Sequence, residues 1–162
     1  MRLPIQTQIY IYRKAENKIE FLLLKRISSR GGFWQGITGG LDEGESIKEC
    51  ALREVAEETG ITGVENIFGP YYVFQFEDEG FYNSTAKDKN LDMSTIPINK
   101  FVVSEYVFAI EVDENTNIDL NNNIYQEHEE FKWCTFEEAL SLLKYDSGKQ
   151  ALKILNEKLN KE

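Results

Sequence analysis

Three glutamates, Glu54, Glu57 and Glu58, stand close together in a segment with the composition of a helix. Their i, i+3 and i+4 spacing places the side chains on one helical face, where like charges repel and lower helix stability. A bound hard cation would compensate for this repulsion, because Mg²⁺ and Mn²⁺ prefer oxygen ligands. Glutamate is also a good helix former that is common on surfaces. Taken alone, the cluster leaves a metal site and a solvated acidic face both open.

The residues around the glutamates favour the metal site. The segment from position 39 to 61 has the pattern G-x5-E-x7-R-E-U-x-E-E-x-G-U, in which U is a bulky apolar residue. The residues that form it are Gly39, Glu45, Arg53, Glu54, Val55, Glu57, Glu58, Gly60 and Ile61. At average residue frequencies, a chance match is on the order of one in a billion per starting point. The segment resembles the Nudix box, and the chain is identified as a member of the Nudix hydrolase family.

This resemblance implies an α/β fold, the Nudix-type α/β/α sandwich with a central mixed β-sheet, and hydrolysis of a nucleoside diphosphate linked to another group. In Nudix proteins, the residues that match Glu54, Glu57 and Glu58 bind divalent cations, usually together with the carbonyl that matches Gly39. The resemblance therefore implies Mg²⁺, or Mn²⁺, as the cofactor. It also implies that Glu45 pairs with Arg53 and holds the loop against the helix, as supporting residues do around metal ligands.

Attack of water on phosphorus needs a base, and two glutamates are candidates for it. Glu57 is the first. The second is Glu127, which precedes the last expected strand and is a candidate for metal ligand as well as base. Glu129 competes with Glu127 for this role. His128 is the only histidine, but lone surface histidines usually have no catalytic function, so the predicted site leaves it out.

The residues before the box indicate the substrate. Phe33-Trp34-Gln35 and Thr38-Gly39 resemble the approach to the box in bacterial dihydroneopterin triphosphate pyrophosphatases, and segments 127–128, 131–133 and 147–151 follow in a similar order. The resemblance implies a nucleoside-triphosphate-like substrate, dihydroneopterin triphosphate or a purine nucleotide, cut to the monophosphate and pyrophosphate. Candidates for binding its phosphates or ring are Arg2, Lys25, Arg26 and Thr38. Candidates for stacking on the ring are Trp34, Phe74 and Tyr82.

Other functions stay open. One is cleavage of dinucleoside polyphosphates, although the chain has Thr38-Gly39-Gly40 where diadenosine polyphosphate hydrolases tend to carry Pro-Lys-Gly. Another is the removal of damaged nucleotides. A non-catalytic nucleotide-binding regulator is the third, and the intact carboxylates argue against it.

Local patterns predict the elements that position these residues. Segments 6–12 and 19–27 consist largely of β-branched, aromatic and leucine residues and predict a β-hairpin around a polar turn at 13–18, and 36–40 is a short extended piece. Ser46 and Glu49 form a capping box for a helix that ends at Gly60, and Thr135 with Glu138 opens a second helix to about position 144. Strands are expected at 64–76, 101–112 and 130–134, a helix at 147–159, and a long polar loop or insertion at 77–100.

Bulk properties set the remaining expectations. The 162 residues suit one domain, residues 1–162. A net charge of −10 argues against non-specific binding to nucleic acid. The chain has no signal-like segment and no apolar run long enough for a membrane, so a cytoplasmic protein is expected. Cys50 and Cys134 are expected to be core thiols without a disulfide. The expected partner is a small nucleotide-like molecule, and a homodimer stays open.

Overall fold

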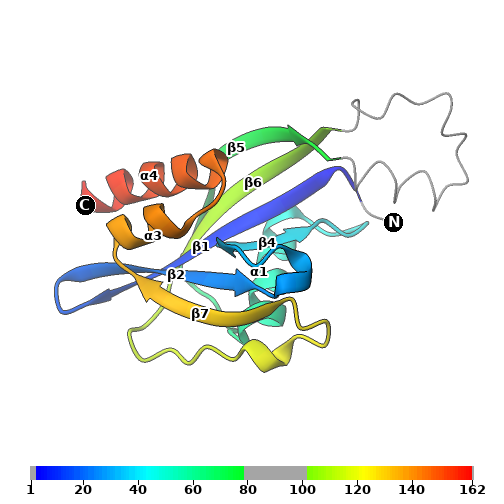
Figure 1. The fold of residues 1–162 in the computed structure, drawn as a ribbon. Coiled ribbons are helices and arrows are strands. Elements are labelled where there is room, and N and C mark those ends of the chain that lie inside the picture. Colours follow the sequence, from blue (N-terminus) through cyan, green and yellow to red (C-terminus); the bar gives the residue numbers. More distant parts are fainter. Residues whose placement is uncertain (1–2, 79–101, 162) are drawn as a thin grey trace, which may run out of the picture.

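A mixed sheet of seven strands forms the centre of the computed structural model, which describes residues 3–78 and 102–161. The path through the sheet is β3-β2-β1-β6-β5, with β4 beside β1 and β7 beside β2 (Figure 1). The pair β1–β6 is parallel and the other pairs are antiparallel. The strands are β1 (Ile5–Ala15), β2 (Lys18–Arg26), β3 (Trp34–Gln35), β4 (Ile37–Gly40), β5 (Ile67–Glu77), β6 (Val102–Glu111) and β7 (His128–Cys134).

The predicted hairpin is confirmed, but its turn is tighter than the polar segment 13–18 indicated. Ala15 pairs with Lys18 across the ladder, so only two residues connect the strands. These residues, Glu16 and Asn17, have φ angles of 50° and 64°. Positive φ at both central positions produces the mirror-image turn whose twist matches that of the strands. The charged residues around the turn therefore belong to the strands themselves.

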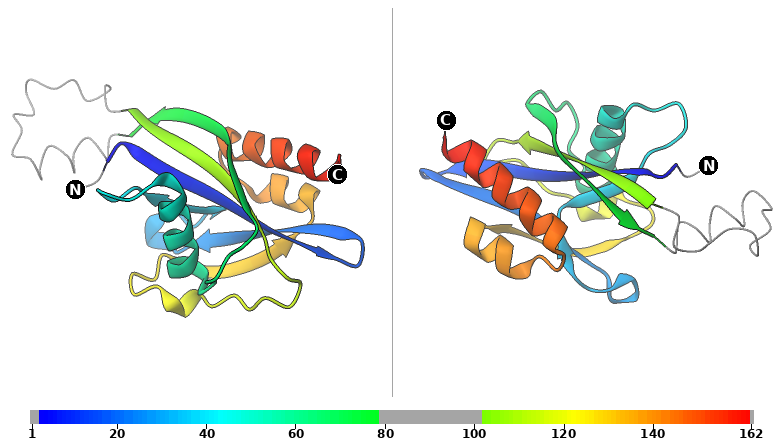
Figure 2. Two further views of the ribbon diagram at one scale, coloured as in Figure 1. Left: turned by 180° about the vertical axis from the view of Figure 1, so that it is seen from behind. Right: turned by 90° about the horizontal axis from the view of Figure 1, so that it is seen from above.

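Helices cover both faces of the sheet, which confirms the predicted sandwich (Figures 1 and 2). Alternating residues of β1 divide between the two layers. Ile9 and Ile11 pack in one apolar cluster with Val55 of α1 (Ile47–Thr59). Tyr10 and Tyr12 pack in the other cluster, which includes residues of α3 (Phe136–Leu142) and α4 (Asp146–Asn160).

The ends of α1 lie where the sequence predicted them. The Ser46 side chain accepts a hydrogen bond from the Glu49 backbone N–H at 3.1 Å, and Gly60 ends the helix with a φ of 77°. The reciprocal capping box of Thr135 and Glu138 is present at α3. Because these signals are local, the sequence predicts them well.

Strand ends were less accurate. β5 begins at Ile67 rather than position 64, and β7 begins at His128 rather than position 130. Glu77, the first residue of the predicted loop 77–100, is the last residue of β5. The part of this loop beyond position 78, which includes Tyr82, lies outside the described residues. Arg2 lies outside them as well.

Both cysteines are buried and free, as expected.

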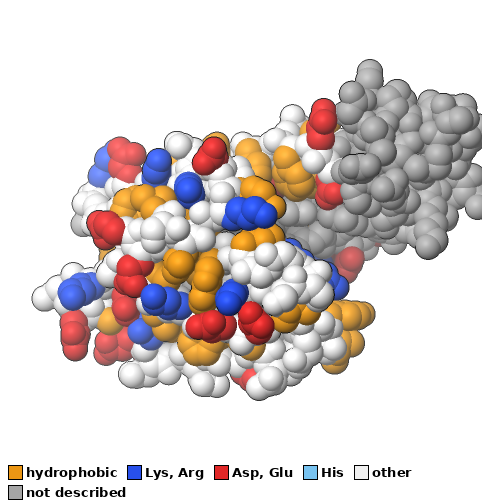
Figure 3. All heavy atoms as spheres, in the orientation of Figure 1, with side chains coloured by type: hydrophobic (Ala, Val, Ile, Leu, Met, Phe, Trp, Pro, Cys, Tyr) orange, Lys and Arg blue, Asp and Glu red, His pale blue; other side chains and the backbone are white. Residues whose placement is uncertain are grey.

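Within the described ranges, no helix is long and apolar enough to cross a membrane. On the face drawn in Figure 3, acidic and basic side chains are interspersed rather than separated into patches.

Candidate active site

A cleft of about 1240 Å³ joins the carboxylates of α1 to the opposite layer of the sandwich. One end is lined by Glu54, Glu57 and Glu58, and the other by β5 and the start of α4. β4 borders the cleft through the segment 38–40. The sheet therefore does not separate the predicted metal ligands from the side chains of its far face, and one ligand can contact both.

Glu54 is buried, with 8% of its surface exposed, and lies directly against Gly39. A Cβ atom on Gly39 would lie 1.9 Å from Cδ of Glu54, so any other residue there would displace the Glu54 side chain. Burial raises the pKa of Glu54 to about 7; the Arg53 guanidinium opposes this rise, while Glu57 adds to it. Arg53 Nη1 donates to the Glu54 carboxylate at 2.8 Å.

Glu58 is held more firmly, by donors from two distant segments. It is 2% exposed, and the Asn123 amide donates to one carboxylate oxygen at 2.6 Å. His128 Nδ1 lies 2.7 Å from the other oxygen, and His128 Nε2 lies 3.2 Å from the Gln35 amide nitrogen. An amide nitrogen only donates, so Nε2 is the acceptor and Nδ1 carries the proton that is donated to Glu58.

Sequence reasoning missed both residues that hold Glu58. The sequence predicts a lone surface histidine at His128, but the residue is 6% exposed and forms the first position of β7. No motif in the sequence indicates Asn123. The position of His128 next to Glu127 was a weak signal, but its burial depends on the pairing of β7 with Arg26 of β2, which is not visible in the sequence.

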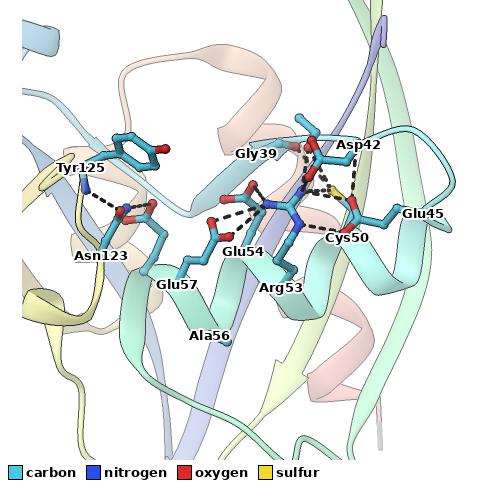
Figure 4. Close-up of polar contacts among 12 residues, drawn as sticks. Gly39, Asp42, Glu45, Cys50, Arg53, Glu54, Ala56, Glu57, Asn123 and Tyr125 are labelled. Atoms are coloured by element: carbon cyan, nitrogen blue, oxygen red, sulfur yellow. Dashed lines mark hydrogen bonds and ion pairs between the residues drawn. The ribbon is translucent and has the colours of Figure 1, made fainter. Parts of the chain in front are cut away.

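Arg53 connects the loop before α1 to the glutamates of the helix (Figure 4). Its Nε and Nη2 atoms donate to the two carboxylate oxygens of Glu45 at 2.7 and 3.0 Å, which confirms the expected pair. Nη2 also donates to the Gly40 carbonyl at 2.9 Å. The hydrogen bond from Arg53 is the main cause of a lowered pKa at Glu45. Glu57 is more loosely held, with both oxygens 3.4 Å from Nη1 of Arg53.

The structure separates the two competing loop glutamates. Glu127 lines the cleft, and its carboxylate lies within a group of possible ligand atoms from Glu58, Glu127 and His128 that are all within 4.8 Å of one another. Glu127 also forms an ion pair with Arg30 at 3.4 Å, whereas Glu129 forms one with Lys25 at 3.5 Å. Neither Glu129 nor Lys25 is among the residues that line the cleft.

The other predicted substrate contacts within the described residues lie in the cleft. Arg26, Trp34, Thr38 and Phe74 all line it. Nε of Arg26 is buried and has no hydrogen-bond partner within the described part of the chain. The cleft therefore combines cationic, aromatic and carboxylate groups.

The donor set fits a hard divalent cation. The carboxylates of Glu54, Glu57 and Glu58 line one cleft, and Gly39 packs against Glu54. The Gly39 carbonyl accepts hydrogen bonds from the Thr7 hydroxyl at 3.4 Å and from the Cys50 thiol at 3.8 Å. These are oxygen donors, the kind that Mg²⁺ takes from proteins. A cation would also offset the cost of burying charge at Glu54.

The sandwich and its carboxylate helix define a hydrolase that cleaves phosphoanhydride bonds. A family model described as the NUDIX domain matches residues 4–155. The chain belongs to the Nudix family.

Of two individual relatives, one has the name of a nucleotide hydrolase and the other that of an acyltransferase. An asymmetrical bis(5'-nucleosyl)-tetraphosphatase from Caenorhabditis elegans is 28% identical over 137 residues, which cover 85% of this chain and 83% of that protein. A Myxococcus xanthus octanoyltransferase is 30% identical over 151 residues, 93% of this chain but 36% of the relative, so the chain spans about a third of that protein.

Solved structures share the fold. A Nudix hydrolase from Listeria monocytogenes superposes with a TM-score of 0.75 at 28% identity, covering 98% of this chain and 96% of the other. The E. coli dihydroneopterin triphosphate pyrophosphohydrolase has a TM-score of 0.69 at 23% identity, with 94% of each chain covered. At this lower identity, the likeness concerns the fold alone.

Proposed function

We propose that this enzyme hydrolyses a nucleoside-triphosphate-like substrate, a pterin or purine triphosphate, to the monophosphate and pyrophosphate. The observation that carries the proposal is the continuous cleft. It joins the α1 carboxylates to Trp34 and Phe74, which offer apolar ring surface, and to the unpartnered guanidinium nitrogen of Arg26. A planar ring and a short polyphosphate need these groups in one cavity.

In this proposal, Glu54, Glu57, Glu58, Glu127 and the Gly39 carbonyl hold Mg²⁺. The cation supplies charge neutralisation at the phosphates and lowers the pKa of an attacking water. Mn²⁺ has similar ligand preferences and is expected to substitute.

The protein's own residues position the reaction. Glu57 is the candidate base, because its side chain is 46% exposed and faces the cleft, where a water can reach it. Glu127 is the alternative base. Arg53 acts through Glu45 and Glu54, which it fixes relative to β4. Arg26 donates to phosphate oxygens, an arrangement that suits the planar guanidinium.

A second candidate function is the cleavage of a dinucleoside polyphosphate. The cleft of about 1240 Å³ exceeds the usual size of a site for one small ligand, which is roughly 300–1,000 Å³. The similarity to the C. elegans tetraphosphatase supports the same possibility. Such a substrate would place a second nucleoside in the space that a single triphosphate leaves free.

A substrate panel tests the proposal. It contains dihydroneopterin triphosphate, common and oxidised nucleoside triphosphates and a dinucleoside tetraphosphate, each assayed with and without Mg²⁺ and with the phosphate product identified. Metal-dependent release of pyrophosphate from a triphosphate is expected. Binding without turnover would indicate a regulator, and turnover of the tetraphosphate alone would favour the second candidate.

Conservative variants test the carboxylates. Glu57→Gln should reduce turnover by orders of magnitude while the fold is retained, because the side chains differ little in shape. Glu58→Gln should reduce turnover similarly but also lower stability, because its amide nitrogen would face one of the two donors, Asn123 or His128. Glu65→Gln, at an exposed position outside the cleft, is the matched control. Full activity in both cleft variants would overturn the proposed site.

A further inference from the structure

A polar cluster of Gln6, Gln8 and Glu105 lies in the cleft on the sheet face opposite α1. Gln6 and Gln8 alternate along β1 on the same side as Tyr10, which packs in the cluster with α4, and Gln6 is the register partner of Glu105 on β6. Gln8 is 7% exposed and Glu105 is 3% exposed, yet both line the cleft. Burying such groups costs free energy unless hydrogen bonds compensate.

The hydrogen bonds within the cluster fix the orientation of Gln8. The amide nitrogens of Gln6 and Gln8 donate to different carboxylate oxygens of Glu105, that of Gln8 at 2.7 Å. When Glu105 is ionised it only accepts, and an amide oxygen cannot donate, so the Gln8 nitrogen faces Glu105. The Gln8 oxygen then faces away and has no hydrogen-bond partner in the described part of the chain. A buried acceptor without a donor is costly, and a ligand in the cleft can supply that donor.

The chemistry of the cluster selects among heterocycles. A carboxylate and an open amide oxygen are neighbouring acceptors, and each carboxylate oxygen can accept a second hydrogen bond. The edge that complements them has two adjacent N–H donors. The 2-amino-4-oxopyrimidine edge, which guanine and pterins share, has this pattern. Adenine presents an amino donor beside a ring-nitrogen acceptor, which would face the carboxylate unfavourably.

Aromatic residues border the cluster. Phe74 is the register partner of Glu105 across β5 and β6, so the two side chains lie on the same face of the sheet. Phe76 follows two residues later, with its ring centroid 6.1 Å from that of Phe74. Both phenylalanines line the cleft and offer an apolar surface to the face of a ring.

We propose that Gln8 and Glu105 recognise the 2-amino-4-oxopyrimidine edge of the substrate and thereby determine specificity for guanine-type or pterin-type rings. This inference deepens the proposed function, on which it rests, and identifies the end of the cleft that holds the ring. The phosphates then extend from this end toward α1.

Binding of monophosphates tests the inference without depending on catalysis. The probes are GMP, IMP, which lacks only the 2-amino group, and AMP, each titrated into the wild-type protein by calorimetry. A hydrogen bond to a charged group corresponds to a difference of roughly 10- to 100-fold in affinity. We expect GMP to bind at least 10-fold more tightly than IMP or AMP. A difference below 3-fold between GMP and IMP, or no detectable binding of GMP, overturns the inference.

Substitutions locate the source of the preference. Glu105→Gln and Gln8→Leu should each reduce the GMP-to-IMP ratio at least 3-fold. Glu111→Gln on the same strand and Gln75→Leu on β5 are the matched controls outside the cleft, and both should retain the ratio. A ratio that persists in either cluster variant contradicts the assignment. The wild-type titrations need no variant, so a substitution that prevents folding does not remove the test.

The substrate panel separates the two proposals. If no triphosphate is hydrolysed with Mg²⁺ but GMP binds preferentially, the proposed reaction is wrong and the ring site stands. If triphosphates are hydrolysed but GMP and IMP bind equally, the ring site is wrong and the reaction stands.

Discussion

Substituting alanine for Gly39 would place a methyl group where the Glu54 carboxylate now lies. The new Cβ would be 1.9 Å from Cδ of Glu54, 2.1 Å from Oε1 and 2.3 Å from Cγ. The φ angle of Gly39 lies outside the left-handed region, so alanine fits the backbone and the conflict is purely steric. Glu54 must therefore move away from Gly39.

The cost follows from these contacts. Overpacking a filled site costs about 1–3 kcal/mol. The displaced carboxylate also loses its 2.8 Å contact with Arg53, whose side chain is 29% exposed, so solvent screening limits this loss to about 1 kcal/mol. The sum of roughly 2–4 kcal/mol corresponds to a fall in Tm of roughly 4–16 °C for a chain of this size. Turnover should fall at least about 100-fold if Glu54 is a metal ligand.

A double-mutant cycle separates this steric effect from a general need for glycine. In the Glu54→Ala background the carboxylate is gone, and Gly39→Ala should then cost less than about 1 kcal/mol. Urea unfolding of the wild type, both single variants and the double variant, without added metal, measures the coupling. Equal costs in both backgrounds would refute the steric argument. Activity of Gly39→Ala within 3-fold of the wild type would show that the position of Glu54 is not required for the reaction.

Substitutions at three further positions probe other contacts. Arg53→Ala should lower both Tm and activity because it breaks the bidentate pair with Glu45; an unchanged Tm would exclude the supporting role. His128→Ala should reduce kcat more than His128→Asn, since asparagine retains a donor that can face Glu58; equal losses would argue against that hydrogen bond. Burial raises the pKa of Glu105 from 4.5 to about 7, so the folded state holds this proton more tightly than the unfolded state does. Between pH 4.5 and 7 the folded state therefore loses up to about 3 kcal/mol of stability. The wild type should therefore lose stability relative to Glu105→Gln as the pH rises from 5 to 8, and a difference that does not vary with pH would contradict this.

The elements that the sequence predicted well are those with local causes. Ser46 and Gly60 determine the ends of α1 through bonds within a few residues of each end, and the β-branched, aromatic and leucine residues of β1 and β2 identify the hairpin. Arg53 and Glu45 are eight positions apart, but a motif of fixed spacing links them. Short-range rules and a specific motif were sufficient for these features.

The features that were missed depend on contacts between distant segments. The sequence offers Lys25 and Arg26 equally as substrate contacts. In the structure the register of the β2–β7 ladder shifts between these two residues, and their environments differ. Only Arg26 lines the cleft, and Lys25 pairs with Glu129. The partnership of Gln8 with Glu105 spans 97 positions and requires the parallel pairing of β1 with β6. Periodicity does not determine which strands become neighbours.

The three glutamates of α1 look equivalent in the sequence, because i, i+3 and i+4 spacing states only that they share a helical face. Their surroundings distinguish them. Glu58 is fixed by donors from two other segments, and Glu54 is confined between Gly39 and Arg53, whereas Glu57 is half exposed and has a single loose contact with Arg53. A metal ligand benefits from being held in place by its neighbours, but a base must exchange a proton with water. The environments therefore favour Glu54 and Glu58 as fixed ligands and Glu57 as the base, a division that helix geometry alone does not provide.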